Sequence, residues 1–343
     1  MRDYIEKVCK KEHLNFEEMT DASSIMLDAA TDTRLIKEFL IALSEKGETA
    51  NEVAALATVI KRLAIPLSYP NGNYMDNCGT GGDGFNSFNI STASAFVLAG
   101  VGVKVAKHGN RKVSSSSGSS DVLEALGIRT TMDIQDSLHL LKNEGLTFLY
   151  APTVHPVLKS IGLVRQQIGK PTIFNLVGPL TNPISLNSQF TGISRKDFTM
   201  EYAKVLHMLG RERAIVVCGA GGMDEASLAG RNSFVLVEKG DLIPFKLIPE
   251  DVGLPSYSPT SVRGGNAEEN AVILRDLLTG KQDAYFDSVI FNAGIGLFAN
   301  GAVANIPEGI KLAKDSILSG KALHKLETVI AYSNQTSTLE VIR

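Results

Sequence analysis

The residues with the clearest chemical potential lie between Asp76 and Asp121. Four glycines fall within six residues of this segment: Gly79, Gly81, Gly82 and Gly84. Glycine lets the backbone take positive φ and come close to a ligand, so such a loop can point several N–H groups at one anion. The same loop carries Asp83, whose carboxylate suits a hydroxyl group or a metal ion. We therefore expect a ligand that combines phosphate with hydroxyls or a metal.

Two further segments strengthen this expectation. Ser91 or Thr92 is predicted to cap a helix over the apolar residues 93–100, and a helix N-terminus attracts phosphate. The sequence KHGNR at residues 107–111 supplies two cations, and only serine and glycine occupy residues 114–120. Such tracts are flexible linkers or mobile ligand-binding loops, and the lack of a domain change across this one favours a loop. Together these groups suit the binding of a phosphorylated sugar with a metal.

The glycines also satisfy the dinucleotide-binding pattern G-x-G-x-x-G, which is weak evidence alone. That motif requires an acidic residue about 20 positions later for the ribose, whereas this sequence has Val103, Lys104 and Val105 in that region. Asp83 inside the loop would also repel a bare pyrophosphate. A P-loop is excluded because G-x-x-x-x-G-K-[ST] does not occur. The pattern thus favours a sugar phosphate over a dinucleotide.

Helices are predicted to carry residues 1–68. Apolar residues recur at helical spacing, as in Leu35, Ile36, Phe39, Leu40 and Leu43. Thr49 and Glu52 match a capping box, and Pro66 would end the helix that follows. These helices have no evident chemistry, and we expect a small packed bundle.

Strand-like and helix-like patterns alternate after about residue 74. Strand candidates occupy residues 101–106, 148–150, 190–193, 214–218, 233–237 and 288–294, and helical patterns occupy 121–127, 198–209 and 267–278. Alternation of this kind predicts α/β layers around a central sheet. We divide the chain into a helical domain at 1–68, joined by part of 160–190, and an α/β domain at 69–343.

Composition narrows the class of protein. The chain has 343 residues, of which 44% are hydrophobic and 21% charged, so it can bury a large core. A net charge of −3 argues against nucleic acid as the main partner. No apolar run is long enough for a membrane span, and the first residues lack a signal-peptide core. Three cysteines far apart in sequence favour a reducing cytoplasm over a disulfide framework or zinc site.

Five blocks of sequence resemble one known family, the anthranilate phosphoribosyltransferases of tryptophan biosynthesis. They are CGTGGDGFNSFNIST (78–92), KHGNR (107–111), SSDVLEALG (119–127), VRQQIGKPTIFNLVGPLTNP (164–183) and GGMDEAS (221–227). The resemblance implies a helical domain plus a larger α/β domain with a central mixed sheet, in a nucleoside phosphorylase-like architecture. It also implies a homodimer formed through the helical domain.

The resemblance implies an enzyme that transfers phosphoribose from phosphoribosyl pyrophosphate (PRPP) to the amine of anthranilate, with Mg²⁺. The products would be N-(5-phosphoribosyl)anthranilate and pyrophosphate. Two alternatives remain at this point. A pyrimidine nucleoside phosphorylase would use phosphate without an acidic metal pair. A non-catalytic nucleic-acid-binding relative would show a basic face, which the acidic balance does not favour.

Residue-by-residue correspondence with that family assigns the sites. The expected PRPP contacts are Gly79, Gly82, Asp83, Ser87, Asn89, Ile90, Ser91, Thr92, Lys107, His108, Gly109, Asn110, Arg111, Lys112, Val113, Ser114, Ser115 and Ser119. The expected anthranilate contacts are Gly79, Asn110 and Arg165, and the expected metal ligands are Ser91, Asp224 and Glu225. No residue is assigned as general acid or base, because an arylamine is already neutral at pH 7.

The residues themselves leave some of these assignments open. Asp224 and Glu225 follow a strand candidate, where ligands gather in α/β sheets, although acidic pairs also commonly begin surface helices. Lys170-Pro171 replaces the usual Gly-x-Arg-Thr pattern of the family, which affects local packing or the access of the acceptor. The segment 178–183 reads either as a hinge between domains or as a static turn. His155, like His108, is interpreted as structural rather than as a base.

Overall fold

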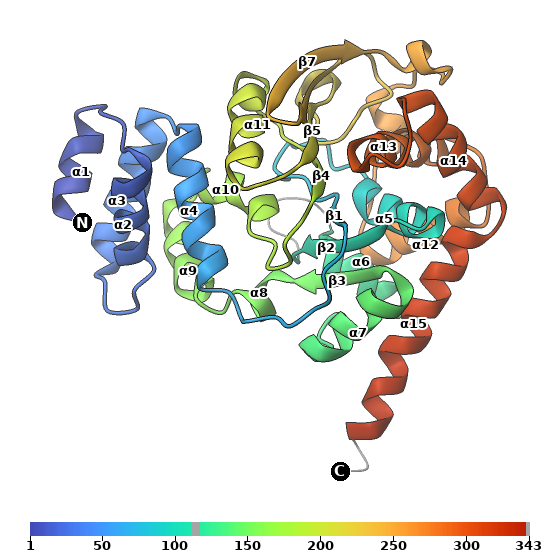
Figure 1. Ribbon diagram of the computed structural model, residues 1–343, viewed down its shortest axis with the longest axis horizontal. Coiled ribbons are helices and arrows are strands. Elements are labelled where there is room, and N and C mark those ends of the chain that lie inside the picture. The colour runs from blue at the N-terminus through green and yellow to red at the C-terminus, as the bar shows by residue number, and fades with distance from the viewer. Residues whose placement is uncertain (112–116, 341–343) are drawn as a thin grey trace.

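The structure is a computed structural model that describes residues 1–111 and 117–340 (Figure 1). Four helices form the N-terminal bundle: α1 (Arg2–Cys9), α2 (Phe16–Met26), α3 (Thr33–Lys46) and α4 (Ala50–Arg62). Capping boxes begin two of them, with Asn15 and Glu18 at α2 and with Thr49 and Glu52 at α4. The box predicted from Thr49 and Glu52 is thus confirmed.

Glu52 also holds the bundle together from inside. Its carboxylate is buried and lies 2.9 Å from Lys46 Nζ, while its other oxygen accepts a hydrogen bond from the Leu14 amide at 2.9 Å. A buried charge is costly unless it is paired and hydrogen-bonded, and here both conditions hold. The side chain therefore connects the α1–α2 loop, the end of α3 and the start of α4.

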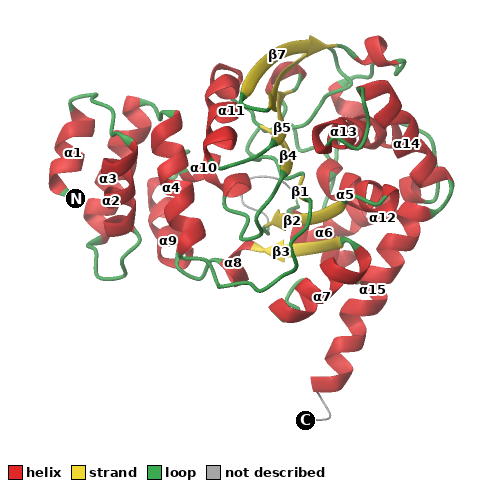
Figure 2. Cartoon of the chain, viewed as in Figure 1, coloured by secondary structure: helices red, strands yellow, loops and turns green. Residues whose placement is uncertain are grey.

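In the described part of the chain, seven strands form one mixed sheet in the order β3-β2-β1-β4-β5-β6-β7 (Figure 2). Neighbouring strands from β3 to β5 are parallel, and β6 and β7 continue the sheet antiparallel at one edge. The strands are β1 (Tyr74–Asp76), β2 (Lys104–Gly109), β3 (Leu146–Tyr150), β4 (Ser188–Gly192), β5 (Arg213–Cys218), β6 (Asn232–Glu238) and β7 (Asp241–Leu247).

Helices cover both faces of this sheet. The remaining helices are α5 (Ile90–Val101), α6 (Ser119–Ala125), α7 (Ile134–Glu144), α8 (Ala151–Val154), α9 (Leu158–Ile168), α10 (Phe174–Val177), α11 (Thr199–Met208), α12 (Ala267–Leu278), α13 (Ala284–Asn300), α14 (Ile306–Leu318) and α15 (Lys321–Glu340). Short 3-10 turns include η1 (Gly178–Leu180) and η3 (Ala220–Gly222). Within the described residues, no helix combines the length and apolar character needed to cross a membrane.

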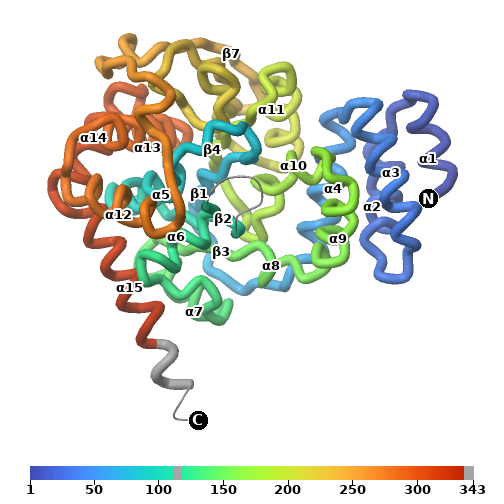
Figure 3. Tube along the Cα trace, turned by 180° about the vertical axis from the view of Figure 1, so that it is seen from behind, coloured from blue at the N-terminus to red at the C-terminus, as the bar shows by residue number. Residues whose placement is uncertain are grey.

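Alternating residues of β5 send side chains into two different cores. Ile215 and Val217 pack with α5 and α13, whereas Ala214 and Val216 pack with α11 and the N-terminal bundle. This alternation follows from the two-residue period of a strand. The second core also contains residues of α9 and α10, and Figure 3 shows these two helices beside α4. The bundle therefore shares its core with the segment that the sequence analysis joined to it.

Several predictions of local structure were wrong in detail. Residues 288–294 were predicted as a strand, but they lie within helix α13, which is buried on nearly all sides and so lacks an amphipathic period. Neither Ser91 nor Thr92 caps α5, because the N-cap is Asn89. The predicted strand at 101–106 begins only at Lys104. The predicted mixed central sheet and the helices at 198–209 and 267–278 are confirmed, with small shifts of their ends.

Candidate active site

The glycine loop, Lys107 and the acidic pair Asp224 and Glu225 come together at the C-terminal ends of the parallel strands. The glycine loop follows β1, Lys107 lies near the end of β2, and Asp224 and Glu225 follow β5 and η3. Ligands of open α/β sheets bind at this edge. The tertiary structure thus joins segments that are separated by more than 100 residues of sequence.

The glycine loop takes conformations that other residues would resist. Gly81, Gly82 and Gly84 have φ values of 69°, 79° and 77°, and a Cβ atom at any of them would meet open space. The positive φ rather than crowding therefore requires glycine here. The Gly81 amide donates a hydrogen bond to Asp224 Oδ2 at 2.6 Å. The loop is therefore attached to the turn that carries Asp224 and Glu225, which we call the acidic turn.

Three other glycines let the acidic turn lie against the sheet. A Cβ at Gly79 would lie 2.7 Å from Asp224 Oδ2. A Cβ at Gly192, the last residue of β4, would collide with the Asp224 carbonyl, and one at Gly219 would collide with the Glu225 carbonyl. The backbone of the acidic turn therefore occupies the space that side chains would fill at these positions.

The carboxylates of this turn repel one another. Burial raises the pKa of Asp224 well above its usual value, and the neighbouring charges of Asp83 and Glu225 raise it further. Burial raises the pKa of Glu225 to about 7, although Lys107 opposes the shift. Asp83 lies close because its Oδ2 accepts a hydrogen bond from the Asp224 amide at 3.2 Å. A cation between these groups would remove the repulsion.

The acidic turn has the donor set that Mg²⁺ prefers. Magnesium binds hard oxygen ligands, and one or two protein carboxylates suffice when substrate phosphates and waters complete the octahedron. No cluster of three or more His, Cys, Asp or Glu side chains with metal-binding spacing occurs in the described residues. Two crowded carboxylates without a dedicated cage therefore fit a metal that is bound together with its substrate.

Lys107 is the buried cation of the site. Only 2% of its surface is exposed, and its Nζ donates to Ser91 Oγ at 3.1 Å and to the Asn77 carbonyl at 3.4 Å. No carboxylate lies within salt-bridge distance of Lys107 in residues 1–111 and 117–340. Ser91 in turn donates its amide to Glu225 Oε1 at 3.2 Å. The predicted metal ligands Ser91 and Glu225 are therefore adjacent, and Lys107 lies beside them.

Of the other predicted contacts around α5, some lie beside the glycine loop and some are buried in the core. Asn89 Oδ1 accepts from Asn270 Nδ2 at 3.0 Å, which connects α5 to α12. Ile90 and Thr92 are buried, and Thr92 Oγ1 has no hydrogen-bond partner. Ser87 forms an isolated bridge with Arg263. Among these, Asn89 and Ser87 lie at the edge of the glycine loop, whereas Ile90 supports it from the core.

The segment after β2 continues the site. Ser119 Oγ donates to the Asn110 carbonyl at 3.2 Å, and Gly109 leaves room for that hydroxyl. Arg111 forms an ion pair with Glu124 on α6 at 2.5 Å and lies over the ring of Tyr150. Four predicted contacts lie outside the described residues: Lys112, Val113, Ser114 and Ser115.

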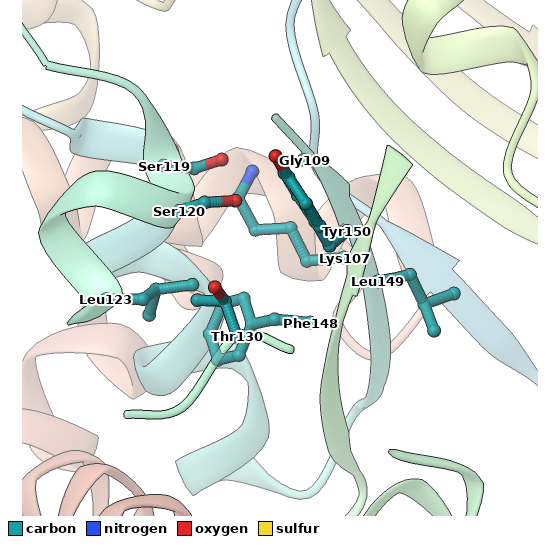
Figure 4. Close-up of a pocket in the computed structure, with 9 residues that line it drawn as sticks. All are labelled: Lys107, Gly109, Ser119, Ser120, Leu123, Thr130, Phe148, Leu149 and Tyr150. Atoms are coloured by element: carbon teal, nitrogen blue, oxygen red, sulfur yellow. The ribbon is translucent and has the colours of Figure 1, made fainter. Parts of the chain in front are cut away.

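A small pocket beside Lys107 includes residues that the sequence analysis did not identify. Ser120, Thr130, Phe148 and Tyr150 line it together with Lys107, Gly109 and Ser119 (Figure 4). In Figure 4, Lys107 and the two serines lie at one end and Leu123, Thr130 and Phe148 at the other. Thr130 and Tyr150 carry no motif, and only the pairing of β2 with β3 brings Tyr150 next to Gly109.

Both histidines near the motifs are buried and neutral. Burial lowers the pKa of His108 and of His155 to about 4. His108 Nδ1 lies 3.1 Å from the Gly178 carbonyl, and His155 Nε2 lies 2.7 Å from the Thr181 carbonyl. A carbonyl oxygen can only accept a hydrogen bond, so the proton of each neutral ring lies on the contacting nitrogen, Nδ1 of His108 and Nε2 of His155. These contacts hold the segment 178–183 in place.

Arg165, the predicted anthranilate contact, lies on α9 at the N-terminal bundle. Its guanidinium lies over the Phe174 ring, with 5.8 Å from its carbon to the ring centroid, and donates to Asn175 Oδ1 at 3.3 Å. The short helix α10 carries both partners and runs directly into Gly178, which contacts His108 next to Lys107. One element thus connects Arg165 to the part of the site that contains Lys107.

Comparison with known proteins agrees with this architecture. The family described as "Glycosyl transferase family, a/b domain" matches residues 71–323, and "Glycosyl transferase family, helical bundle domain" matches residues 2–64. The anthranilate phosphoribosyltransferase of Listeria monocytogenes serotype 4a is 51% identical over 335 residues, which cover 98% of this chain and 99% of the relative. The chain belongs to the anthranilate phosphoribosyltransferase family. The resemblance inferred from five sequence blocks is therefore confirmed.

Solved structures of this family share the fold over nearly the whole chain. The anthranilate phosphoribosyltransferase of Thermus thermophilus has a TM-score of 0.92 at 37% identity, covering 97% of this chain and 99% of that one. The enzyme of Saccharomyces cerevisiae in complex with PRPP and Mg has a TM-score of 0.88 at 29% identity, covering 97% of each chain. The predicted fold class is confirmed by these structures.

Proposed function

We propose that this member of the anthranilate phosphoribosyltransferase family transfers phosphoribose from PRPP to the amine of anthranilate in tryptophan biosynthesis. The observation that carries the proposal is the joining of the glycine loop, Lys107 and the acidic turn at one edge of the sheet. These groups suit a pyrophosphate, a ribose and a metal. The yeast relatives with PRPP and Mg, and with 4-fluoroanthranilate, support the same substrates.

On the donor side, the loop amides and Lys107 bind phosphate oxygens. Asp224, Glu225 and Ser91 would hold Mg²⁺, which when bound neutralises charge on the departing pyrophosphate. The positive charge that develops on the ribose resembles that in glycoside cleavage, so carboxylates such as Asp83 near the sugar are favourable. Because these groups are fixed by the packing of the acidic turn, they need little rearrangement during the reaction.

On the acceptor side, Arg165 binds the anthranilate carboxylate through its planar guanidinium. The arylamine already has a free lone pair, so no strong base is required. His108 and His155 agree with this, because both are buried and burial lowers the pKa of each to about 4, which makes them weak bases. Catalysis then rests on positioning the amine against the ribose and on electrostatic stabilisation.

Anthranilate fluorescence tests the proposal. The protein is mixed with anthranilate, PRPP and Mg²⁺, and loss of fluorescence is followed with and without EDTA. Loss that requires all three components is the expected result. A folded protein that binds PRPP but consumes no anthranilate would contradict the acceptor assignment. Phosphorolysis of a pyrimidine nucleoside that resists EDTA would instead indicate the nucleoside phosphorylase alternative.

The proposal extends to assembly and compartment. A homodimer formed through the helical domain, as the family resemblance implies, is part of the proposal; the large apolar side chains exposed in this region include Phe16, Leu63 and Leu163. A cytoplasmic location is supported by three cysteines that are all free of disulfides. We keep the division at residues 68 and 69, with part of 160–190 in the helical domain. Light scattering after size exclusion tests the dimer.

A further inference from the structure

The charge of Arg165 has no acidic partner among residues 1–111 and 117–340. Burial lowers the pKa of Arg165, but a guanidinium begins so high that it stays charged at neutral pH. Within the part of the chain that the structure describes, no carboxylate forms a salt bridge with it. Its partners are the Asn175 amide oxygen at 3.3 Å and the Phe174 ring. The cation is therefore held in place without being neutralised.

Asn175 makes this contact from a fixed position. Its Oδ1 also accepts a hydrogen bond from the Thr172 amide at 3.0 Å. The chain turns after α9, where Gly169 follows the last helical residue with a φ of 63°. Ser44 Oγ on α3 then donates a hydrogen bond to the Pro171 carbonyl at 3.3 Å. One amide oxygen thus serves two donors and connects α9 to the start of α10.

An amide is the suitable acceptor at this place. A carboxylate would bind the guanidinium more strongly, but it would compete with a carboxylate substrate for the same charge. An amide oxygen accepts a hydrogen bond and adds no charge. Asn175 can therefore orient one edge of the guanidinium and leave its charge for a bound anion.

We infer that Asn175 is a positioning residue for substrate recognition, which holds the Arg165 guanidinium in the orientation that receives the carboxylate of the acceptor. This inference rests on the proposed function, in which Arg165 binds anthranilate. Asn175 and Ser44 contact the backbone of Thr172 and of Pro171, beside the Lys170-Pro171 departure from the family pattern.

Steady-state kinetics of Asn175→Ala and Asn175→Asp test the inference. With Asn175→Ala, the KM for anthranilate should rise about tenfold, which is the usual effect of one lost hydrogen bond to a charged group. The KM for PRPP should stay within about twofold. Asn175→Asp keeps the size and the acceptor oxygen, so a purely structural role predicts nearly normal kinetics. We expect instead a rise at least as large as for alanine, because the new charge neutralises Arg165.

Asn305→Ala is the matched control. Asn305 also accepts from a backbone amide, that of Glu308 at 2.9 Å, but it caps the distant helix α14. Its loss should lower stability without changing either KM.

A double-mutant cycle with Arg165→Ala completes the test. In the Arg165→Ala background, Asn175→Ala should have no further effect on the KM for anthranilate. Additive effects, equal rises in both KM values, or normal kinetics of Asn175→Asp would overturn the inference while leaving the proposed function intact. If Arg165→Ala alone leaves the KM for anthranilate unchanged, the acceptor site of the proposed function is wrong, and the inference falls with it.

Discussion

At the scale of residues, the site is defined by charges that the fold forces together. Asp83 of the glycine loop lies against the turn that carries Asp224 and Glu225, and Lys107 is buried nearby. Such an arrangement is unfavourable for stability and is typical of functional sites. Removing one carboxylate should therefore affect activity and stability in different ways.

Asp224→Asn is expected to lower turnover by about two to three orders of magnitude, as loss of a key electrostatic group usually does. Its thermal midpoint should stay equal or rise, because asparagine can still accept from the Gly81 amide and no longer repels Glu225. Fluorescence kinetics and thermal unfolding measure the two effects. Asp241→Asn, at an exposed position on β7, is the control. Nearly normal turnover at limiting Mg²⁺ would contradict the metal assignment.

His155 makes stability depend on pH in a defined direction. Its pKa is about 4 in the folded protein against an ordinary 6.5, so the unfolded chain binds more protons between these values. Stability from this group is complete above pH 6.5 and is lost as the pH falls towards 4. The free energy of unfolding of the native protein should therefore fall between pH 7.5 and pH 5. His155→Gln, which keeps a donor for the Thr181 carbonyl, should make this decrease smaller by about 2 kcal/mol.

Urea midpoints at the two pH values measure this difference. The comparison with the variant is needed because burial raises the pKa of Asp76, and raised carboxyl pKa values favour the folded state at low pH. Equal losses for the native protein and the variant would show that His155 is not responsible.

At the scale of elements, the end of β4 and the acidic turn fit by backbone contact. Gly192 is the last residue of β4, and its missing side chain leaves the space for the Asp224 carbonyl. The Gly192 carbonyl also accepts from the Thr80 amide at 2.9 Å, so the same residue supports the glycine loop. A change in this one strand end should disturb both loops.

Gly192→Ala is therefore expected to reduce kcat/KM for PRPP by at least about a hundredfold. The alanine Cβ would collide with the Asp224 carbonyl oxygen, so the acidic turn would have to move in a closely packed site. Gly162→Ala is the control. Gly162 lies in helix α9, where a Cβ would meet open space, so alanine should raise helix stability by roughly 0.5–1 kcal/mol. Steady-state kinetics and thermal unfolding report both variants. Unchanged kinetics for Gly192→Ala would show that the acidic turn can shift without loss.

At the scale of the whole molecule, the connection 178–183 is fixed in place by hydrogen bonds that involve buried side chains. His108, Gln189 and His155 contact the carbonyls of Gly178, Pro179 and Thr181, respectively. Asn182 Nδ2 donates to Asp76 Oδ2 at 2.9 Å and to the Ala106 carbonyl at 2.7 Å. With so many buried contacts, the segment favours the static turn over the hinge that its glycine and prolines also allowed.

Asn182→Ala should lower the free energy of unfolding by about 2–4 kcal/mol, because it leaves the buried Asp76 carboxylate with fewer donors. Both KM values should rise, since the connection 178–183 joins the Arg165 end of the site to the Lys107 end. Asn187→Ala is the comparison. Asn187 lies just beyond the same connection, is half-buried and donates to Glu212 Oε1 at 3.4 Å, so its loss should lower the free energy of unfolding by less. Urea unfolding with parallel kinetics distinguishes the two. Equal decreases in the free energy of unfolding for the two variants would argue that Asn182 has no special role.

The sequence alone determined the features that depend on neighbours along the chain. Capping at Thr49, the helical period of α3 and α11, and the glycine loop before Lys107 follow from local rules and from motifs. The five family blocks then identified Asp224, Glu225 and Arg165 as candidates. Helix α13 was missed because a helix buried on every side shows no period that distinguishes it from a buried strand.

Only the tertiary structure decided which groups meet. The contact of Asp83 with the Asp224 amide, the fit of Gly192 against the same turn and the support of Arg165 by Asn175 join positions on different elements. Their geometry depends on how the strands are ordered and how α9 and α10 lie against the bundle. Residue types fix what each group can do chemically, but distances and burial arise from packing, which no local pattern records.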